Sequence, residues 1–411
     1  MRILITGASG FIGQRLVDAL RAGGHAVIAL TRRDADFTQD LHAAAWQPHL
    51  ASVDAVINTV GILREHGQQT FERVHVRAPQ ALFAACAAAG IQRVVQISAL
   101  GAEHGTSGYF RSKHRADEFL AQLPLDWTVV QPSLVFGIGG ASARLFTMMA
   151  SLPIIALPGG GGQRVQPIHI DDLILAIAAV VERRDFVHRR VALVGPEALS
   201  LREFLARLRN SLGLPRARFL SIPLPLMRAA ATVSQLSSRS LLDRESLAML
   251  EAGNTADPAD TQELLTRPAR TVEQFVSVAE RNLVAEHAEL QWLLPLLRWS
   301  IAFVWIWTGI VSLGLYPHAA SLALLARTGI TGSSAEVALY AAATLDLAFG
   351  AATLLMRRRR WLWLAQFVLI LVYTIIITVA LPEFWLHPYG PILKNLPLLV
   401  CLALLYRLEA R

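Results

Sequence analysis

Two side chains that could exchange a proton with a substrate lie four residues apart. Tyr109 and Lys113 fall on one expected helix, which runs from Tyr109 to about Leu123, so they share a face. An ammonium group close to a phenol stabilises the phenolate and lowers the pKa of the phenol from its ordinary value of about 10. The tyrosine would then act as an acid or a base near neutral pH, and the same lysine could hold a ribose.

The rarity of lysine supports a chemical role for this pair. Lys113 and Lys394 are the only two lysines among 38 basic residues, so arginine is the usual cation of this chain. A lysine at this spacing suits a task that needs a compact point charge. The alternative is a pair of exposed helical residues without a chemical task.

A glycine-rich turn near the N-terminus could hold the phosphates of a dinucleotide. An apolar strand begins at Ile3, and a helix that continues to Leu20 follows the turn. Backbone N–H groups and the dipole at the start of such a helix favour negative charge. The GxxGxxG spacing differs from the commoner GxGxxG, and a purely structural turn is the alternative. The residues expected to line the cofactor here are Gly7, Ala8, Ser9, Gly10, Phe11, Ile12 and Gly13.

Two arginines follow the second expected strand, His25–Leu30. In dinucleotide-binding folds the end of this strand meets the adenosine ribose. An acidic residue would bind the 2′-hydroxyl, whereas Arg32 and Arg33 suit a 2′-phosphate, so NADP is favoured over NAD. Two solvated arginines at a strand end are the alternative.

Strand and helix patterns alternate through the first half of the chain. Further strands are expected at residues 54–60, 93–98, 127–131 and 191–194, with helices at 79–89 and 201–212. This alternation predicts an α/β fold, a Rossmann-like, doubly wound parallel sheet with ligands at the carboxyl ends of its strands. We expect a nucleotide-binding domain at 1–212, a small substrate lobe and linker at 213–290, and a membrane domain at 291–411.

The last part of the chain is apolar enough to cross a membrane. Residues 361–381 contain no charge over 21 positions, which suffices for one spanning helix. Three more spans are expected at residues 299–316, 337–356 and 391–406, which completes a four-helix transmembrane bundle. Within the second span Asp346 is a costly acid, and it could meet a quinone, a proton route or another helix.

The positive charges predict how these spans are oriented. Arg298, Arg357–Arg360, Arg407 and Arg411 all fall on one side of a four-span topology, and that side is expected to be cytoplasmic. The first strand has no signal-peptide pattern before it, which also favours a cytoplasmic N-terminal domain. We therefore expect a multi-pass protein of a bacterial-type inner membrane, with both the N-terminal domain and the C-terminus in the cytoplasm.

Other classes of function are not expected. The basic residues are scattered apart from Arg357–Arg360, so a net charge of +7 does not indicate nucleic-acid binding. Cys86 and Cys401 lie far apart and predict neither a disulfide framework nor a cysteine metal site. His169 stands beside two acids, but three donors on one short turn make a poor metal site, and Asp171 is the expected N-cap of the next helix.

Several motifs together resemble the short-chain dehydrogenase/reductases. The resemblance is to the extended and atypical branches, which include sugar-nucleotide epimerases and dehydratases. Some of these motifs look like the atypical group that contains the 39-kDa accessory subunit of respiratory complex I. The four expected spans resemble the DoxX-like membrane proteins in their pattern. The matching motifs are Gly7–Gly13, Asn58–Leu63, Ile97–Ala102, Tyr109–Lys113 and Gln131–Gly137.

This resemblance implies roles for individual residues. Tyr109 would be the acid or base, Lys113 the ribose anchor, and Ser98 the match for the family's polarising serine or threonine. Thr106 and Ser107 are substitutes for Ser98. The three glycines would bind the pyrophosphate. The cofactor would also lie beside Asn58, Val60, Gly61 and Pro132.

The expected function is a membrane-anchored, NADP- or NAD-dependent reductase or epimerase. It would act on a hydroxyl or carbonyl carbon of a small molecule, and the membrane domain favours a lipophilic one. The alternative is a nucleotide-binding structural or assembly subunit of a membrane redox complex that performs no turnover. Some atypical members of the family bind the nucleotide without known turnover, so the motifs fit both.

Overall fold

The computed structural model describes residues 1–227, 229, 250 and 253–409. The chain divides into two compact units, Met1–Glu289 and Leu290–Arg411. The first unit contains residues 213–289 together with residues 1–212, and the separate substrate lobe at 213–290 stays a prediction.

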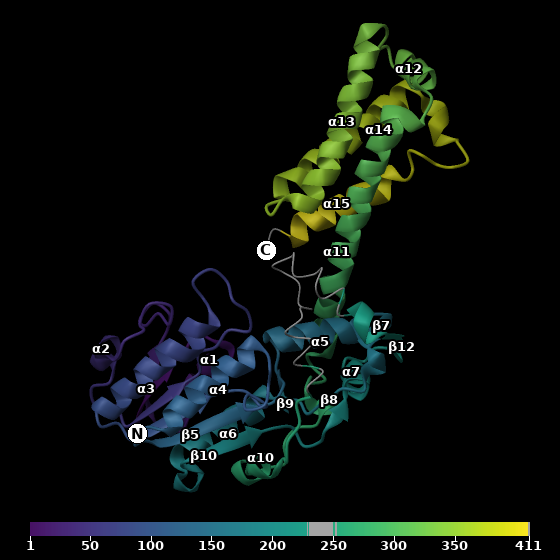
Figure 1. The fold of residues 1–411 in the computed structure, drawn as a ribbon. Coiled ribbons are helices and arrows are strands. Elements are labelled where there is room, and N and C mark those ends of the chain that lie inside the picture. Colours follow the sequence, from purple (N-terminus) through teal and green to yellow (C-terminus); the bar gives the residue numbers. More distant parts are fainter. Residues whose placement is uncertain (228, 230–249, 251–252, 410–411) are drawn as a thin grey trace. The chain divides into compact units, whose positions relative to one another are not determined.

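A six-stranded sheet forms the core of the first unit (Figure 1). All neighbouring strands run parallel, and Thr6 lies opposite both Leu30 and Asn58, so the carboxyl ends of three strands are aligned. The predicted doubly wound α/β sheet is confirmed. In spatial order the strands are β10 (Arg189–Leu193), β5 (Asp126–Pro132), β4 (Arg93–Ile97), β3 (Ala55–Asn58), β1 (Arg2–Thr6) and β2 (Ala26–Leu30).

Helices cover both faces of this sheet because its central strands are apolar on both sides. Ile3 and Ile5 pack into one core cluster and Leu4 into the other, since successive side chains of a strand point to opposite faces. Residues of α1 (Phe11–Ala22) and α6 (Ile170–Glu182) fill the first cluster. Residues of α3 (Ala78–Ala88) and α4 (Gly108–Ala121) join the second.

The strand order identifies the edge where a ligand is expected to bind. β1 lies between β2 and β3. The chain therefore forms β2 on one side of β1 and then crosses to the other side to form β3. In open α/β sheets, ligands bind beyond the carboxyl ends of the strands at such a switch point. The glycine turn after β1 therefore lies at the expected place.

A lobe with its own apolar core completes the first unit. We call it the β7–β12 lobe, because β7 (Ile154–Pro158) and β12 (Arg218–Ile222) pair in parallel within it. Its core combines residues of these strands with residues of α5 (Ala141–Ser151), α7 (Leu201–Ser211) and the start of α11 (Arg281–Ile310). The remaining elements are α2 (Ala43–Trp46), α10 (Ala259–Leu264), β6 (Val135–Phe136), β8 (Arg164–Val165), β9 (Ile168–His169) and β11 (Leu199–Ser200).

One predicted helix cap is wrong. α6 begins at Ile170 with His169 as its N-cap, and the ring accepts a 3.3 Å hydrogen bond from the backbone N–H of Asp171. Asp171 therefore lies in the first turn, where a negative charge favours the helix dipole. The fully buried Asp172 pairs with Arg267 and, at 3.0 Å, with Arg270.

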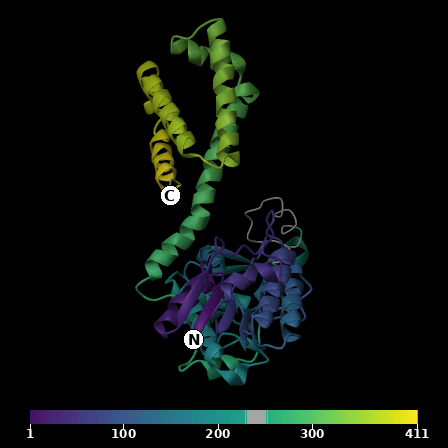
Figure 2. The ribbon, with the colours of Figure 1, turned by 90° about the vertical axis from the view of Figure 1, so that its left-hand side faces the viewer.

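Helices make up the described second unit (Figures 1 and 2). Three are long and apolar enough to cross a membrane: α11 (Arg281–Ile310) with its continuation to Leu315, α13 (Ser333–Leu355) and α14 (Arg360–Ala380). The fourth predicted span is the shorter apolar helix α15 (Asn395–Leu408). A further helix, α12 (His318–Arg327), precedes α13. α11 begins well before the expected Trp299, so the first turns of this helix belong to the first unit.

Polar side chains connect the helices within the second unit. The indole of Trp305 donates to Gln366 at 2.9 Å, and the Gln366 amide donates to Thr353 at 2.8 Å. One carboxylate oxygen of Asp346 is buried and has no hydrogen-bond partner among the described residues. Its role stays a prediction.

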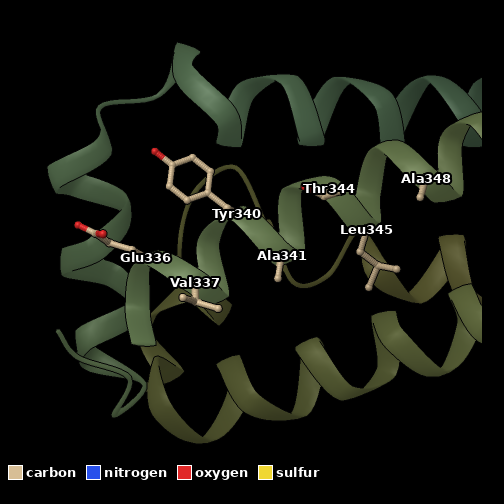
Figure 3. Close-up of a pocket in the computed structure, with 7 residues that line it drawn as sticks. All are labelled: Glu336, Val337, Tyr340, Ala341, Thr344, Leu345 and Ala348. Atoms are coloured by element: carbon tan, nitrogen blue, oxygen red, sulfur yellow. The ribbon is translucent and has the colours of Figure 1, made fainter. Parts of the chain in front are cut away.

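An open groove of about 730 Å³ runs along α13. Figure 3 shows Val337, Ala341 and Leu345 on one side of this helix and Tyr340 on the other. The ring of Tyr340 stacks on that of His318, with centroids 6.0 Å apart. The groove's other lining residues are Glu336, Thr344 and Ala348.

Candidate active site

The glycine turn is built from closely packed backbone. A Cβ atom at Gly13 would lie 2.2 Å from the carbonyl oxygen of Gly7, and Gly7 has a φ of +74° that favours glycine. Gly10 donates its N–H to the Gly7 carbonyl at 2.8 Å. The turn therefore requires glycine at positions 7 and 13 for its own geometry.

The start of α1 is free to receive an anion. Gly10 is its N-cap, no side chain caps the helix, and its first turn contains no acid. Ser9 and Gly10 are exposed. No side chain among the described residues therefore caps the first N–H groups of α1 or offsets the positive end of its dipole. Such a helix start suits a pyrophosphate.

Side chains behind the turn hold it in place. Thr59 donates its hydroxyl to the carbonyl of Thr6 at 2.7 Å, and a Cβ at Gly7 would lie 2.8 Å from that hydroxyl. Asn58 is fully buried, accepts from Thr6 Oγ1 and donates to Gln96 Oε1, each at 2.7 Å. Asn58 thus supports the turn from inside the sheet, and its contact with the cofactor stays a prediction.

The predicted 2′-phosphate residues lie at the carboxyl end of β2. Arg32 and Arg33 are exposed, and Arg32 approaches Asp36 to 3.7 Å. The nearby carboxylate of Asp34 accepts hydrogen bonds from the hydroxyl and N–H of Thr31, which hold the pKa of Asp34 below its usual value. The carboxylate of Asp34 is therefore hydrogen-bonded to Thr31, while the guanidinium groups of Arg32 and Arg33 face solvent.

The aromatic residue of the turn joins two loops. The ring of Phe11 would contact a Cβ at Gly140 at 2.8 Å and one at Gly137 at 3.0 Å. The guanidinium of Arg15 lies 4.3 Å from the centre of this ring and donates to the Ile138 carbonyl at 2.9 Å. The glycine turn and the loop before α5 therefore pack as one piece. The buried Pro132 ends β5, and its carbonyl accepts from Leu100 at 3.0 Å.

Helix α4 brings Tyr109 into an aromatic cluster. Ser107 caps the helix by accepting from the Phe110 N–H at 3.2 Å. Tyr109 is only 9% exposed and contacts Phe71, His75 and Phe110 at centroid distances of 6.0, 5.4 and 5.6 Å. The cluster holds the phenol ring in one orientation beside the loops that follow β3 and β4.

Lys113 reaches the carboxyl ends of the same two strands. Its Nζ donates to the carbonyl of Ile97 at 3.1 Å and to that of Val60 at 3.4 Å. A Cβ at Gly61 would lie 3.1 Å from this nitrogen. The structure therefore brings Lys113, Val60 and Gly61 together, next to the glycine turn held by Thr59.

Ser98 faces α4. Its hydroxyl is buried and donates to the carboxylate of Asp117, one turn beyond Lys113. The other oxygen of Asp117 is buried without a hydrogen-bond partner among the described residues. Ser98 is thus engaged within the protein, and its predicted polarising role stays a prediction, as do the roles of Thr106 and Ser107.

The acidity of Tyr109 differs from the expectation. Burial, followed by the charge of Asp117, raises the pKa of Tyr109 to about 12, so the predicted lowering is wrong for this state of the protein. Burial also lowers the pKa of Lys113 to about 8, against the opposing effect of Asp117. Burial raises the pKa of Asp117 to about 7. Desolvation therefore sets the direction in which the pKa of Tyr109 changes.

His75 is a site residue that the sequence patterns did not indicate. Burial and then the charge of Lys113 lower the pKa of His75 to about 2, so the ring is neutral. Its Nε2 accepts from the Ile62 N–H at 2.9 Å, so the ring proton lies on Nδ1, 2.9 Å from Ser112 Oγ. Ser112 in turn donates to the Tyr109 carbonyl at 2.7 Å. This chain of bonds orients the start of α4.

Two family matches cover different parts of the chain. Residues 3–195 match the NAD dependent epimerase/dehydratase family, and residues 302–403 match the DoxX-like family. The expected nicotinamide dinucleotide agrees with the NAD dependence of the first family. The membrane region expected after residue 290 agrees with the second family and with the three long apolar helices.

Three relatives are similar over the first unit. An epimerase family protein of Mycobacterium bovis is 28% identical over 255 residues, which cover 56% of this chain and 84% of the relative. NADH dehydrogenase (ubiquinone) 1 alpha subcomplex subunit 9, mitochondrial, of Arabidopsis thaliana is 26% identical, covering 55% and 61%. A ceramide reductase of Caulobacter vibrioides is 27% identical, covering 43% and 60%. The chain thus spans about three fifths of the last two.

Solved structures share the fold of the first unit. A nucleoside-diphosphate-sugar epimerase from Staphylococcus aureus has a TM-score of 0.54 at 16% identity, covering 67% of this chain and 99% of that chain. A human epimerase family protein with NADPH has a TM-score of 0.50 at 22% identity, covering 70% and 99%. The protein therefore joins a domain of the NAD dependent epimerase/dehydratase family, in residues 3–195, to a DoxX-like membrane domain, in residues 302–403.

Proposed function

We propose that this protein is a membrane-anchored, NADP(H)-dependent oxidoreductase that acts on a carbonyl or hydroxyl carbon. One observation carries the proposal: Lys113 Nζ lies against Val60 and Gly61 beside the glycine turn, with Tyr109 on the same helix. A dinucleotide on the turn would extend along this edge of the sheet. The bound nicotinamide would supply or accept the hydride.

The side chains of the protein would handle the proton. With a pKa of about 12, the Tyr109 phenol is protonated at neutral pH, so it suits donation to a carbonyl oxygen during reduction. The Lys113 ammonium would hold a ribose hydroxyl and stabilise the phenolate left behind. Phe71 and His75 would keep the phenol oriented and exclude water.

The preference for NADP(H) rests on the end of β2. Arg32 and Arg33 present exposed guanidinium groups there, whereas the carboxylate of Asp34 is occupied by Thr31. Guanidinium groups bind phosphate through charge-assisted hydrogen bonds, often two at a time. These contacts favour a 2′-phosphate over a 2′-hydroxyl.

A lipophilic substrate is proposed from the rim of the site. Leu63 follows β3 and is 63% exposed, and Ile138 follows β6 and is 41% exposed. Both lie in loops at the carboxyl edge of the sheet, where an apolar ligand would cover them and gain from the burial. The relative from Caulobacter is named for a ceramide, itself a lipid.

The first unit is proposed to lie in the cytoplasm of a bacterial-type cell. Positive residues of the second unit gather around the end of α15: Arg298 pairs with Glu409, and Arg359 approaches Glu409 to 3.9 Å. The Arg360 guanidinium lies 4.7 Å from the ring centre of Tyr406. One end of the bundle thus collects cations from α11 and from the start of α14 beside the end of α15, which favours a cytoplasmic location of that end.

Two measurements test the proposal. The protein purified in detergent is analysed by mass spectrometry, and co-purified NADP(H) is the expected result. The same protein is then incubated with NADPH deuterated at the transferred position and a total membrane lipid extract. Deuterium incorporated into a lipid by the wild type, but not by Tyr109→Phe, supports the proposal. Incorporation into soluble sugar nucleotides alone contradicts the lipophilic substrate, and no incorporation into either contradicts turnover.

A second candidate is a structural or assembly subunit that binds the nucleotide without turnover. This candidate is favoured because the Lys113 ammonium and the Ser98 hydroxyl already donate hydrogen bonds within the protein, to the Ile97 carbonyl and to the Asp117 carboxylate. The Arabidopsis relative is named as a subunit of NADH dehydrogenase, so a membrane redox partner would fit this candidate. Tyr109→Phe separates the two: unchanged function in cells with retained nucleotide would support the structural role.

A further inference from the structure

One surface of the β7–β12 lobe is apolar and exposed. β7 and β12 pair in parallel with Ile154 opposite Arg218 and Ala156 opposite Leu220. These four side chains share one face, because alternate residues of a strand point the same way. Ile154 is 55% exposed and Leu220 is 52% exposed, and the other face of β7 packs into the lobe core. We call this surface the β7–β12 face.

Exposed apolar side chains are concentrated on this lobe and its flanks. Leu226 follows β12 and is 62% exposed, and Val278 and Leu283 flank the start of α11 at 79% and 58%. Elsewhere in the described part of Met1–Glu289, only Leu63 among the large apolar side chains is more than half exposed. Where such side chains lie together, as Ile154 and Leu220 do on one face of the β7–β12 pair, they favour contact with a partner.

Two arginines lie at the same surface. Arg216 and Arg218 are exposed at the start of β12, and they share the face of Leu220 because alternate residues point the same way. Apolar side chains with arginines at their border match a bilayer interface that contains anionic lipids.

The chain itself keeps a bilayer within reach of this lobe. α11 starts on the lobe core, where Val284 and Ala285 belong to the same apolar cluster as the inward-facing residues of β7. The same helix continues into the first apolar stretch that is long enough to cross a membrane. From Arg281 to Trp299 the chain spans at most roughly 60 Å even when extended. A tether of this length makes the local concentration of bilayer surface high.

We infer that the β7–β12 face docks onto the surface of an anionic bilayer. Ile154 and Leu220 would enter the head-group region, and Arg216 and Arg218 would pair with lipid phosphates. The inference needs no turnover and goes beyond the proposed function. It would bring the first unit to the same surface that a lipophilic substrate occupies.

Spin labels on the full-length protein test the inference. A nitroxide is attached to Leu220→Cys in a Cys401→Ser background, since the other cysteine, Cys86, is buried. The matched control is Leu175→Cys on α6, a leucine that is 47% exposed. Accessibility to oxygen and to a water-soluble nickel chelate is measured in nanodiscs of phosphatidylcholine with phosphatidylglycerol, and in detergent.

In the anionic nanodiscs the ratio of oxygen to nickel accessibility should be several-fold higher at position 220 than at 175. The double variant Arg216→Gln/Arg218→Gln should bring the ratio at 220 down toward that of the control. Equal ratios at the two positions would overturn the inference. Protection from nickel at 220 in detergent, equal to that in nanodiscs, would also overturn it, because the chain or a second copy would then cover the face.

Discussion

The two halves of the candidate site are built in opposite ways. The glycine turn consists of backbone that is exposed at Ser9 and Gly10, with no side chain capping α1. The Tyr109–Lys113 half consists of side chains that are almost fully buried and that contact or bond to the protein itself.

This difference teaches where each half is sensitive. The geometry of an exposed glycine turn depends on the absence of side-chain atoms at its glycines, so a single added methyl group is enough to disturb it. A buried cluster of ionisable groups depends on desolvation and charge, so removal of one charge alters the pKa values of the others. Four variants test this contrast, in order of decreasing effect.

Gly13→Ala should have the largest effect. The new Cβ would lie 2.2 Å from the Gly7 carbonyl oxygen, so the turn must open. We expect loss of NADPH binding by calorimetry, and a free energy of unfolding lower by about 1–3 kcal/mol. Gly23→Ala is the control, since its Cβ would lie 3.5 Å from the nearest atoms at the far end of α1. Wild-type NADPH affinity in Gly13→Ala would contradict a backbone-built cradle.

Tyr109→Phe should separate chemistry from binding. The ring still fills the aromatic cluster, so NADPH affinity and the free energy of unfolding should not change. Loss of the proton donor should reduce turnover by about 10²- to 10⁴-fold. Tyr340→Phe, which removes a phenol from the second unit, is the matched control. An equal, small effect of both substitutions would remove Tyr109 from the chemistry.

Arg32→Gln/Arg33→Gln should change the choice of cofactor. Loss of charge-assisted hydrogen bonds to a 2′-phosphate should weaken NADPH binding by about tenfold to a hundredfold, with little change for NADH. Dissociation constants for both cofactors provide the measurement. Arg21→Gln, in the last turn of α1, shows the effect of losing one positive charge away from this strand end. Equal weakening for NADH and NADPH would refute recognition of a 2′-phosphate.

Asp117→Asn should move the pH dependence. The negative charge of Asp117 raises the pKa of Lys113, which burial lowers to about 8, so its removal lowers that pKa further. If turnover needs the Lys113 ammonium, the turnover rate falls above about pH 8 in the wild type. In Asp117→Asn this fall should begin at a pH that is lower by roughly one unit. Asp185→Asn, at an exposed ion pair, should leave the profile unchanged. A profile that does not move would show that the two buried groups are uncoupled.

Most of the fold was predictable because its local signals are strong. The apolar runs of β1, β4 and β5 and the glycines around them predict these elements to within one or two residues. The start of α11 was not predictable from hydropathy, because its polar first turns belong to the first unit. The N-cap of α6 was missed because a histidine ring accepts the hydrogen bond there.

The candidate site was predictable in its members more than in its electrostatics. Spacing alone indicates that Tyr109 and Lys113 share a face. The sign of the change in the pKa of Tyr109 depends on burial by Phe71 and His75, which are distant from Tyr109 in sequence. His75 itself belongs to no motif, because a neutral, buried ring is positioned by tertiary contacts alone.

The row of Thr6, Asn58 and Gln96 has a consequence for how the sheet assembles. Its side chains cross three neighbouring strands through two 2.7 Å hydrogen bonds in the apolar interior. A slip of one residue between these strands would turn the polar groups to the opposite face, where they would be buried without hydrogen-bond partners. The row therefore acts as a register lock, and it penalises misaligned sheets before any nucleotide is present.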